Sequence, residues 1–129
     1  MAINTDTPQD DNFVGSFYFK QTVNGNLIGE YANNNDKFIS TESATNNNHS
    51  NACNFIGLYD STWFDTEMHH ANLKIDRREN TNNKIFILRW TDVGGQPNYE
   101  GEGFQVGDKL IGYYRKVLVP PRETNLAVT

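Results

Sequence analysis

Alternating segments joined by very short turns are the feature that most constrains how this chain can fold. Residues 13–19 and 27–31 flank Asn24-Gly25, and residues 99–106 and 110–115 flank Gly107-Asp108. Asn-Gly suits a type I′ turn, because both central residues of that turn need a positive φ, and a leading glycine suits type II′. A hairpin near each end of a small chain predicts a meander of antiparallel strands that closes on itself.

The full pattern predicts about eight strands, a number typical of a small closed barrel. Most links between the apolar segments are short and rich in Asn, Gly and Asp, which favour turns. No segment has a convincing helical period. We therefore predict an all-β fold, an antiparallel up-and-down β-barrel, with strands at residues 13–22, 27–33, 37–43, 54–60, 66–77, 84–91, 99–106 and 109–118.

The first turn also predicts a register for its hairpin. If Asn24-Gly25 form the loop, Val23 pairs with Asn26, and Phe19 then lies opposite Glu30. The register decides which side chains share a face of the sheet, because a slip of one residue turns every side chain over.

The last hairpin is distinguished by its glycines. A loop at Gly107-Asp108 places Glu100 opposite Arg115, close enough for an ion pair across the strands. The other face of this hairpin then carries Gly101, Gly103 and Gly112. Side chains this small indicate tight curvature or a close approach of two backbones, and both fit a small barrel.

Size and charge narrow the class of protein. At 129 residues the chain suits one domain, with tails at residues 1–11 and 120–129. The net charge of −5 argues against nucleic acid and anionic membranes as partners, because both need basic patches. No segment is long and apolar enough for membrane insertion. Cys53 is the only cysteine, which excludes an internal disulfide.

The start of the chain bears on its location. Residues 1–12 are polar and acidic and lack the apolar stretch of a secretory signal peptide. We therefore expect a soluble cytoplasmic protein, although a secreted form made without its leader would look the same.

The opening and closing strands carry a family resemblance. Residues 13–17, with the sequence Phe-Val-Gly-Ser-Phe, resemble the opening F-x-G-x-W motif of the calycins, which include lipocalins and fatty-acid-binding proteins. Phe17 stands where those proteins have the tryptophan. Residues 85–90, 99–103 and 110–114 resemble the closing strands of lipocalin-like bacterial proteins.

A second resemblance, to the avidins, lies in residues 25–31 and 57–61. Avidins are themselves eight-stranded calycins, so this resemblance implies the same barrel. Only Trp63 and Trp90 offer counterparts to the tryptophans that line a biotin pocket in that family, and we do not expect biotin as the ligand.

The calycin resemblance implies a function for the barrel interior. Proteins of this superfamily hold a small apolar molecule inside the barrel, so the expected partner is a small hydrophobic or amphipathic molecule, with no cofactor. In the superfamily the opening aromatic residue packs under an Arg or Lys of the last strand, and Arg115 is the matching residue for Phe17. In fatty-acid-binding barrels an Arg and a Tyr grip the ligand carboxylate, a role open to Arg115 and Tyr113. The competing interpretation is that Glu100 neutralises Arg115 and that this pair closes the barrel end.

Aromatic side chains supply the candidates for a cavity wall. In strands such residues often fill the core, and an eight-stranded barrel is just wide enough either to be filled or to hold one small ligand. Together with Arg115, we select five residues as ligand-binding candidates: Tyr31, Trp63, His69, Trp90 and Tyr113.

The densest group of reactive side chains, at residues 63–70, supports a second hypothesis. Alternation along a strand that reaches Ile75 places Glu67 and His69 side by side inside the barrel. Burial would shift their pKa values and prepare a catalytic acid and base for a metal-free isomerase, cyclase or lyase. The alternative is a strand that starts at the barrel mouth, with both side chains in water. His70 points to the opposite face from His69, so the two cannot chelate one ion, and no metal site is expected.

A third hypothesis is a filled barrel that serves as a protein-interaction module. An exposed Trp63 would favour this hypothesis. Outward apolar residues such as Ile85 and Ile87 would suit a homodimer face. Binder, enzyme and interaction module are all open at the level of the sequence.

Overall fold

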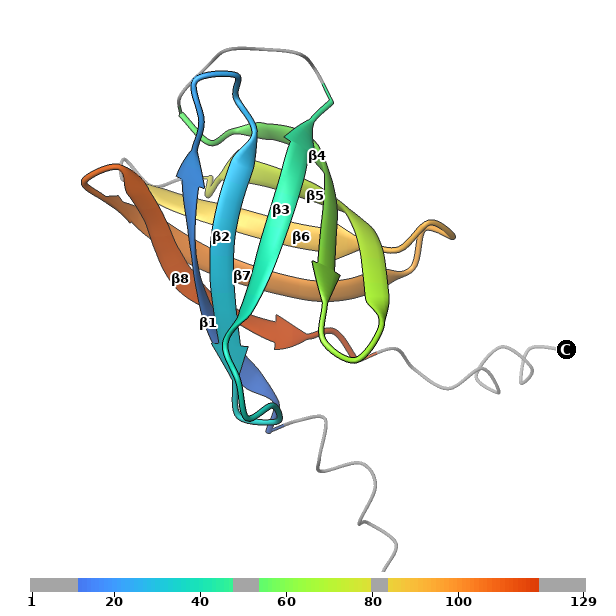
Figure 1. Cartoon of the computed structure of the whole chain (residues 1–129). Coiled ribbons are helices and arrows are strands. Elements are labelled where there is room, and N and C mark those ends of the chain that lie inside the picture. Colours follow the sequence, from blue (N-terminus) through green and yellow to red (C-terminus); the bar gives the residue numbers. More distant parts are fainter. Residues whose placement is uncertain (1–11, 48–53, 80–83, 119–129) are drawn as a thin grey trace, which may run out of the picture.

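The computed structural model describes residues 12–47, 54–79 and 84–118, and all the regular structure in these ranges is β-strand. Each strand pairs antiparallel with the next, and the last returns to pair with the first, which closes a barrel (Figure 1). The predicted all-β, antiparallel up-and-down barrel is thus confirmed. The strands are β1 (Val14–Gln21), β2 (Leu27–Asn33), β3 (Ser40–Asn46), β4 (Gly57–Phe64), β5 (Met68–Arg77), β6 (Ile85–Thr91), β7 (Pro97–Val106) and β8 (Lys109–Lys116).

The tails predicted at residues 1–11 and 120–129 fall outside the ranges that the structure describes, and so does Cys53. Within the described ranges, no helix has the length and apolar character needed to cross a membrane.

Side chains alternate between the inside and the outside of the barrel. In β1, Phe17 and Phe19 are buried, whereas Ser16 and Lys20 are exposed. Burying an apolar side chain of this size stabilises the fold by roughly 1.5–3 kcal/mol. The middle of the barrel is filled in the same way by Leu27, Ala44, Leu73, Ile75, Leu88 and Leu110.

The β1–β2 turn differs from the predicted one by a single residue. The Gly25 N–H donates to the Thr22 carbonyl at 2.9 Å, and the Thr22 N–H donates to the Asn26 carbonyl at 2.8 Å. Gly25 has a φ of 86°, so the loop is a turn followed by a left-handed glycine, not a two-residue loop. As a result, Phe19 pairs with Gly29, one residue from the predicted partner, and the predicted register of this hairpin is wrong.

The register predicted for the last hairpin is confirmed, with Glu100 opposite Arg115. Gly107 leads its turn with a φ of 63°. The glycines of this hairpin face the barrel interior, and a Cβ at Gly101 or Gly112 would collide with the backbone of the facing strand. The close approach of β7 and β8 therefore needs glycine at these positions.

β3 and β4 lie three or four residues further along the chain than the predicted strands at residues 37–43 and 54–60. The apolar pair Phe38 and Ile39 favoured the earlier position, yet these side chains are 79% and 67% exposed. β3 is instead a polar strand that directs Glu42 into the barrel.

One end of the barrel, at the β1–β2 hairpin, is closed by packed and hydrogen-bonded side chains (upper end in Figure 1). The Gln21 amide donates to the Tyr59 hydroxyl at 3.0 Å and to the Gly25 carbonyl at 2.9 Å. Its oxygen accepts the Phe55 N–H at 2.9 Å. The Tyr59 hydroxyl in turn donates to the Phe55 carbonyl at 2.8 Å, and both rings are buried. We call this the closed end.

Candidate functional site

The opposite end of the barrel holds a cavity of about 220 Å³, and we call it the open end. The β2–β3 loop and the β4–β5 turn lie at its mouth, at the lower end in Figure 1. The cavity is lined by aromatic, amide and charged side chains: Phe13, Phe17, Tyr31, Asn33, Asn35, Asp36, Glu42, Trp63, Asp65, Trp90, Tyr99, Tyr114 and Lys116.

Aromatic rings form a continuous wall around this cavity. The Tyr114 ring lies 5.6 Å from the Tyr99 ring and 6.1 Å from the Tyr31 ring, both measured between centroids. Trp90 lies 6.0 Å from Tyr114, and Trp63 lies 6.3 Å from Tyr99. Three of these four pairs meet edge to face, a geometry that holds rings in fixed orientations.

Two neighbours set the position of Tyr114. Gly15 pairs with it across the β1–β8 ladder, and a Cβ at Gly15 would collide with the Tyr114 ring. The Asn33 amide donates to the Tyr114 hydroxyl at 2.9 Å. Burial holds the pKa of Tyr114 above its usual range, so the hydroxyl is neutral. The glycine of the opening motif thus makes room for a ring of the cavity wall.

Glu42 is a carboxylic acid buried in the cavity wall, with 5% of the residue exposed. The Ser61 hydroxyl and the Trp90 indole N–H both donate to its Oε2, at 2.5 and 2.7 Å. Within the described residues, no hydrogen bond engages Oε1. Burial raises the pKa of Glu42 from 4.5 to about 7, and the two hydrogen bonds oppose this rise in part. Glu42 therefore populates both protonation states near neutral pH.

Tyr31, which lines the cavity, has a second polar atom in the cavity wall. Its hydroxyl oxygen is buried and has no hydrogen-bond partner among the described residues. Burial raises the pKa of Tyr31 to about 12, and the neighbouring Ser40 side chain opposes this rise without reaching hydrogen-bonding geometry. A buried hydroxyl without a partner leaves its loss of hydration uncompensated. Among the described residues, the hydrogen-bonding capacity of this buried hydroxyl is thus unmet.

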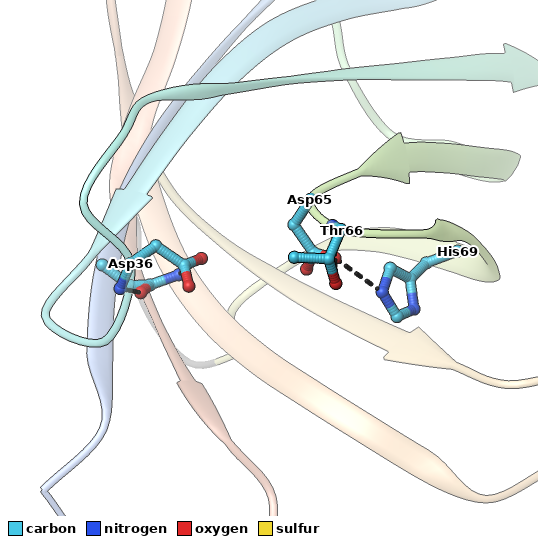
Figure 2. A network of polar contacts seen from close by, with 5 residues as sticks. Asp36, Asp65, Thr66 and His69 are labelled. Carbon is cyan, nitrogen blue, oxygen red and sulfur yellow. Dashed lines mark hydrogen bonds and ion pairs between the residues drawn. The ribbon is translucent and has the colours of Figure 1, made fainter.

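The mouth of the cavity carries two more carboxylates, Asp36 and Asp65, on neighbouring loops (Figure 2). Asp65 Oδ1 lies 2.9 Å from His69 Nε2, and the His69 ring stacks on Trp63 with centroids 5.4 Å apart. Partial burial raises the pKa of Asp65, but hydrogen bonds from the Thr66 backbone and from His69 outweigh it and leave the pKa below its usual value. Asp65 is therefore ionised at neutral pH.

Acidic side chains outnumber basic ones around the cavity. Lys116 is the one basic residue among the described residues of the lining, and its Nζ lies over the Phe13 ring, 5.5 Å from the centroid. In the described part of the chain, no lysine or arginine forms an ion pair with Glu42, Asp36 or Asp65. The potential inside the cavity is therefore negative whenever Glu42 is ionised.

The structure brings together three of the aromatic candidates selected from the sequence. Tyr31, Trp63 and Trp90 line the cavity. His69 is half-buried at its edge, where it contacts Trp63 and Asp65. Glu67 lies in the β4–β5 turn and is exposed, because β5 begins only at Met68. His69 consequently pairs with Asp65. The sequence had suggested Glu67 as its partner.

Tyr113 and Arg115, the other two candidates, lie on the outer surface of β8. They line a separate hollow together with Glu100, and Arg115 does not cover Phe17. The reason is that the glycines of the last hairpin face inward, so the large side chains of the same strands face outward. On β6, Ile85 and Ile87 are half-buried on the outer face, and a homodimer through them stays a prediction.

Sequence reasoning missed Glu42, which is the most perturbed carboxyl group of the cavity. It lies in a strand of small polar residues, Ser-Thr-Glu-Ser-Ala-Thr-Asn, where no apolar alternation distinguishes the inner face. A signal was nevertheless present in the next strand, where Tyr59, Ser61 and Trp63 alternate with outward residues. Pairing that strand antiparallel with the polar one places Glu42 opposite Trp63 and so inside the barrel.

Comparisons with protein-family models, with curated proteins and with solved structures return no match for this chain. Within the described residues, no group of three or more His, Cys, Asp or Glu side chains is arranged to hold a metal ion. The geometry of the cavity is therefore the basis for a proposed function.

Proposed function

We propose that this protein binds one small, partly apolar molecule in the open-end cavity. The observation that carries the proposal is the Tyr31 hydroxyl, which is buried in the cavity wall without a hydrogen-bond partner among the described residues. Buried polar groups in folded proteins are almost always hydrogen-bonded, so an unpartnered one in a cavity wall favours a site whose hydrogen bonding a ligand completes. The unengaged Oε1 of Glu42 provides a second point of attachment.

The size of the cavity agrees with a small ligand. An apolar cavity of roughly 150 Å³ holds a molecule of the size of benzene. The volume here, about 220 Å³, has room for one ring with a short substituent. An aromatic wall with a few polar atoms is also the usual composition of small-molecule sites, in which apolar contacts give affinity and polar groups fix orientation.

The resemblance of the opening motif supports the same proposal. We infer a calycin-like barrel from the closed eight-stranded topology together with the F-x-G-x-aromatic segment, whose Gly15 accommodates Tyr114. Retention of a small hydrophobic or amphipathic molecule in the barrel is the general activity that this resemblance implies.

Tryptophan fluorescence tests the proposal directly, because Trp63 and Trp90 are the only tryptophans of the chain and both line the cavity. Titration with a panel of small aromatic compounds should shift the emission and protect it from acrylamide quenching. Tyr113→Ala, on the outer face, should bind as the wild type does, whereas Tyr31→Phe should bind more weakly. A panel that leaves emission and quenching unchanged at millimolar concentration would count against a ligand cavity.

The two other hypotheses lack an observation that favours them. A metal-free isomerase, cyclase or lyase based on Glu67 and His69 needs those groups together, and Glu67 is exposed. An exposed Trp63 would favour an interaction module, but only 9% of this residue is exposed. Ligand binding is therefore the function that the geometry supports best.

A further inference from the structure

We propose that the ligand is a small organic ammonium ion, and that Glu42 receives the charged nitrogen. The ligand would carry a protonated primary or secondary amine on an apolar body of about one aromatic ring. This inference rests on the proposed binding function and names the ligand class for the same cavity. Three independent features of the open end support it.

The first feature is the incomplete coordination of Glu42. Two neutral donors, Ser61 and Trp90, both bind Oε2, and no cationic residue in the described part of the chain pairs with the carboxyl group. An ionised carboxylate in a buried site is stable only when it is paired and hydrogen-bonded. An ammonium group would provide both the charge and the N–H donors that Oε1 lacks.

The second feature is the nature of the cavity wall. Six of its lining residues carry aromatic rings besides Tyr31. The face of an aromatic ring attracts cations within about 6 Å, more strongly when water is excluded. The protein already uses this contact at the rim, where Lys116 Nζ lies 5.5 Å from the centre of the Phe13 ring.

The third feature is the charge at the entrance. Asp36 and Asp65 both line the mouth, and Asp65 is held in its ionised form by Thr66 and His69. A negative entrance attracts cations and repels anions, which concentrates an ammonium ion at the site and excludes carboxylates and phosphates. The negative charge at the entrance therefore disfavours fatty acids and other carboxylate ligands, which an Arg and Tyr pair would bind.

A set of three probes of nearly equal size tests the proposal by isothermal titration at neutral pH. The probes are 2-phenylethylamine, which is cationic, 2-phenylethanol, which is neutral, and 3-phenylpropanoate, which is anionic. The wild type should prefer the amine to the alcohol by at least about tenfold. The anion should bind most weakly.

Three variants identify the group responsible for this preference. Glu42→Gln keeps an acceptor for Ser61 and Trp90 but removes the charge, and it should bind amine and alcohol almost equally. Asp36→Asn, in an exposed loop where loss of the fold is not expected, should weaken the amine alone by a smaller factor. Lys116→Gln, which removes the basic group of the lining, should strengthen amine binding.

The outcomes separate the two proposals. Equal binding of amine and alcohol to the wild type, or preference for the anion, would overturn the ammonium assignment while leaving a ligand cavity in place. An amine preference that survives in Glu42→Gln would also overturn it, because another group would then recognise the charge. Failure of all three probes, together with unchanged tryptophan emission for the wider panel, would remove the proposed binding function itself.

Discussion

The two ends of this barrel are built from similar side chains but differ in how their polar atoms are paired. At the closed end, the buried Tyr59 hydroxyl donates one hydrogen bond to a backbone carbonyl and accepts one from Gln21. At the open end, the equally buried hydroxyl of Tyr31 has no partner among the described residues. The same residue type completes the structure at one end and leaves a hydrogen bond unmet at the other.

The carboxyl and amide groups show the same contrast. The Gln21 side chain makes three hydrogen bonds that tie the β1–β2 turn to the segment before β4. Glu42 instead concentrates two donors on one oxygen and has its pKa raised to about 7. Polar groups that satisfy one another stabilise a fold, whereas polar groups left partly unsatisfied in a cavity are characteristic of binding sites. Among the described residues, the open end has this character and the closed end does not.

The largest expected effect is a loss of packing toward the closed end. Phe19 is fully buried in the core, so Phe19→Ala should lower the free energy of unfolding by about 3–5 kcal/mol. Phe13→Ala, at the half-buried rim of the cavity, should cost clearly less. Urea denaturation of both variants measures the difference, and equal losses would show that the two ends are packed alike.

The next effect is a pH dependence of stability that arises from Glu42. Its pKa is raised from 4.5 to about 7 on folding, so the native state binds the proton more tightly than the unfolded chain. Stability from this group is therefore present below pH 4.5 and is lost as the pH rises to about 7, by up to about 3 kcal/mol. Comparison of denaturation of wild type and Glu42→Gln across this range isolates the effect. A difference between the two proteins that does not vary with pH would argue against the raised pKa.

A smaller loss is expected from the hydrogen-bond network of the closed end. Gln21→Ala removes the acceptor of the Phe55 N–H and a donor to Tyr59, which should cost about 1–3 kcal/mol. Thermal unfolding followed by circular dichroism measures this cost. A melting temperature identical to that of the wild type would mean that water replaces the amide without loss.

The smallest effect on stability should come from the corresponding change at the open end. Tyr31→Phe removes a hydroxyl that has no partner in the described part of the chain, so the free energy of unfolding should stay constant or rise by less than about 1 kcal/mol. The same substitution should nevertheless weaken ligand binding, because the acceptor for the ligand is gone. Urea denaturation and the fluorescence titration measure the two quantities on one sample, and a clear destabilisation would reveal a hidden partner for the hydroxyl.

The sequence predicted the barrel more fully than it predicted the site, for physical reasons. Strand alternation and short turns repeat along the chain, so the topology does not depend on any single turn. The register of one hairpin, in contrast, depends on whether Gly25 takes the second or the third position of its loop, a choice that the dipeptide Asn-Gly does not make. Gly107 leads a tighter loop, and there the predicted pairing is found.

The positions of the candidate site residues were hardest to predict where polarity and burial oppose each other. Trp63 and Trp90 were selected as large aromatic residues in strands, and they line the cavity. Tyr113 was selected by the same rule but lies outside, because neighbouring Gly112 takes the inward position. Glu42 was overlooked because a charged residue in a polar strand resembles a solvent-exposed one until its pairing with β4 is known.

Two-dimensional NMR of the ¹⁵N-labelled protein during titration with 2-phenylethylamine tests the central contrast most directly. We expect the indole N–H signals of Trp90 and Trp63 to shift together with the amide signal of Glu42. The amide signals of Phe55 and Tyr59 at the closed end should not shift. In Glu42→Gln the shift of the Trp90 indole signal should be largely lost. Shifts centred on the closed end, or on the outer hollow around Tyr113, would contradict a binding site at the open end.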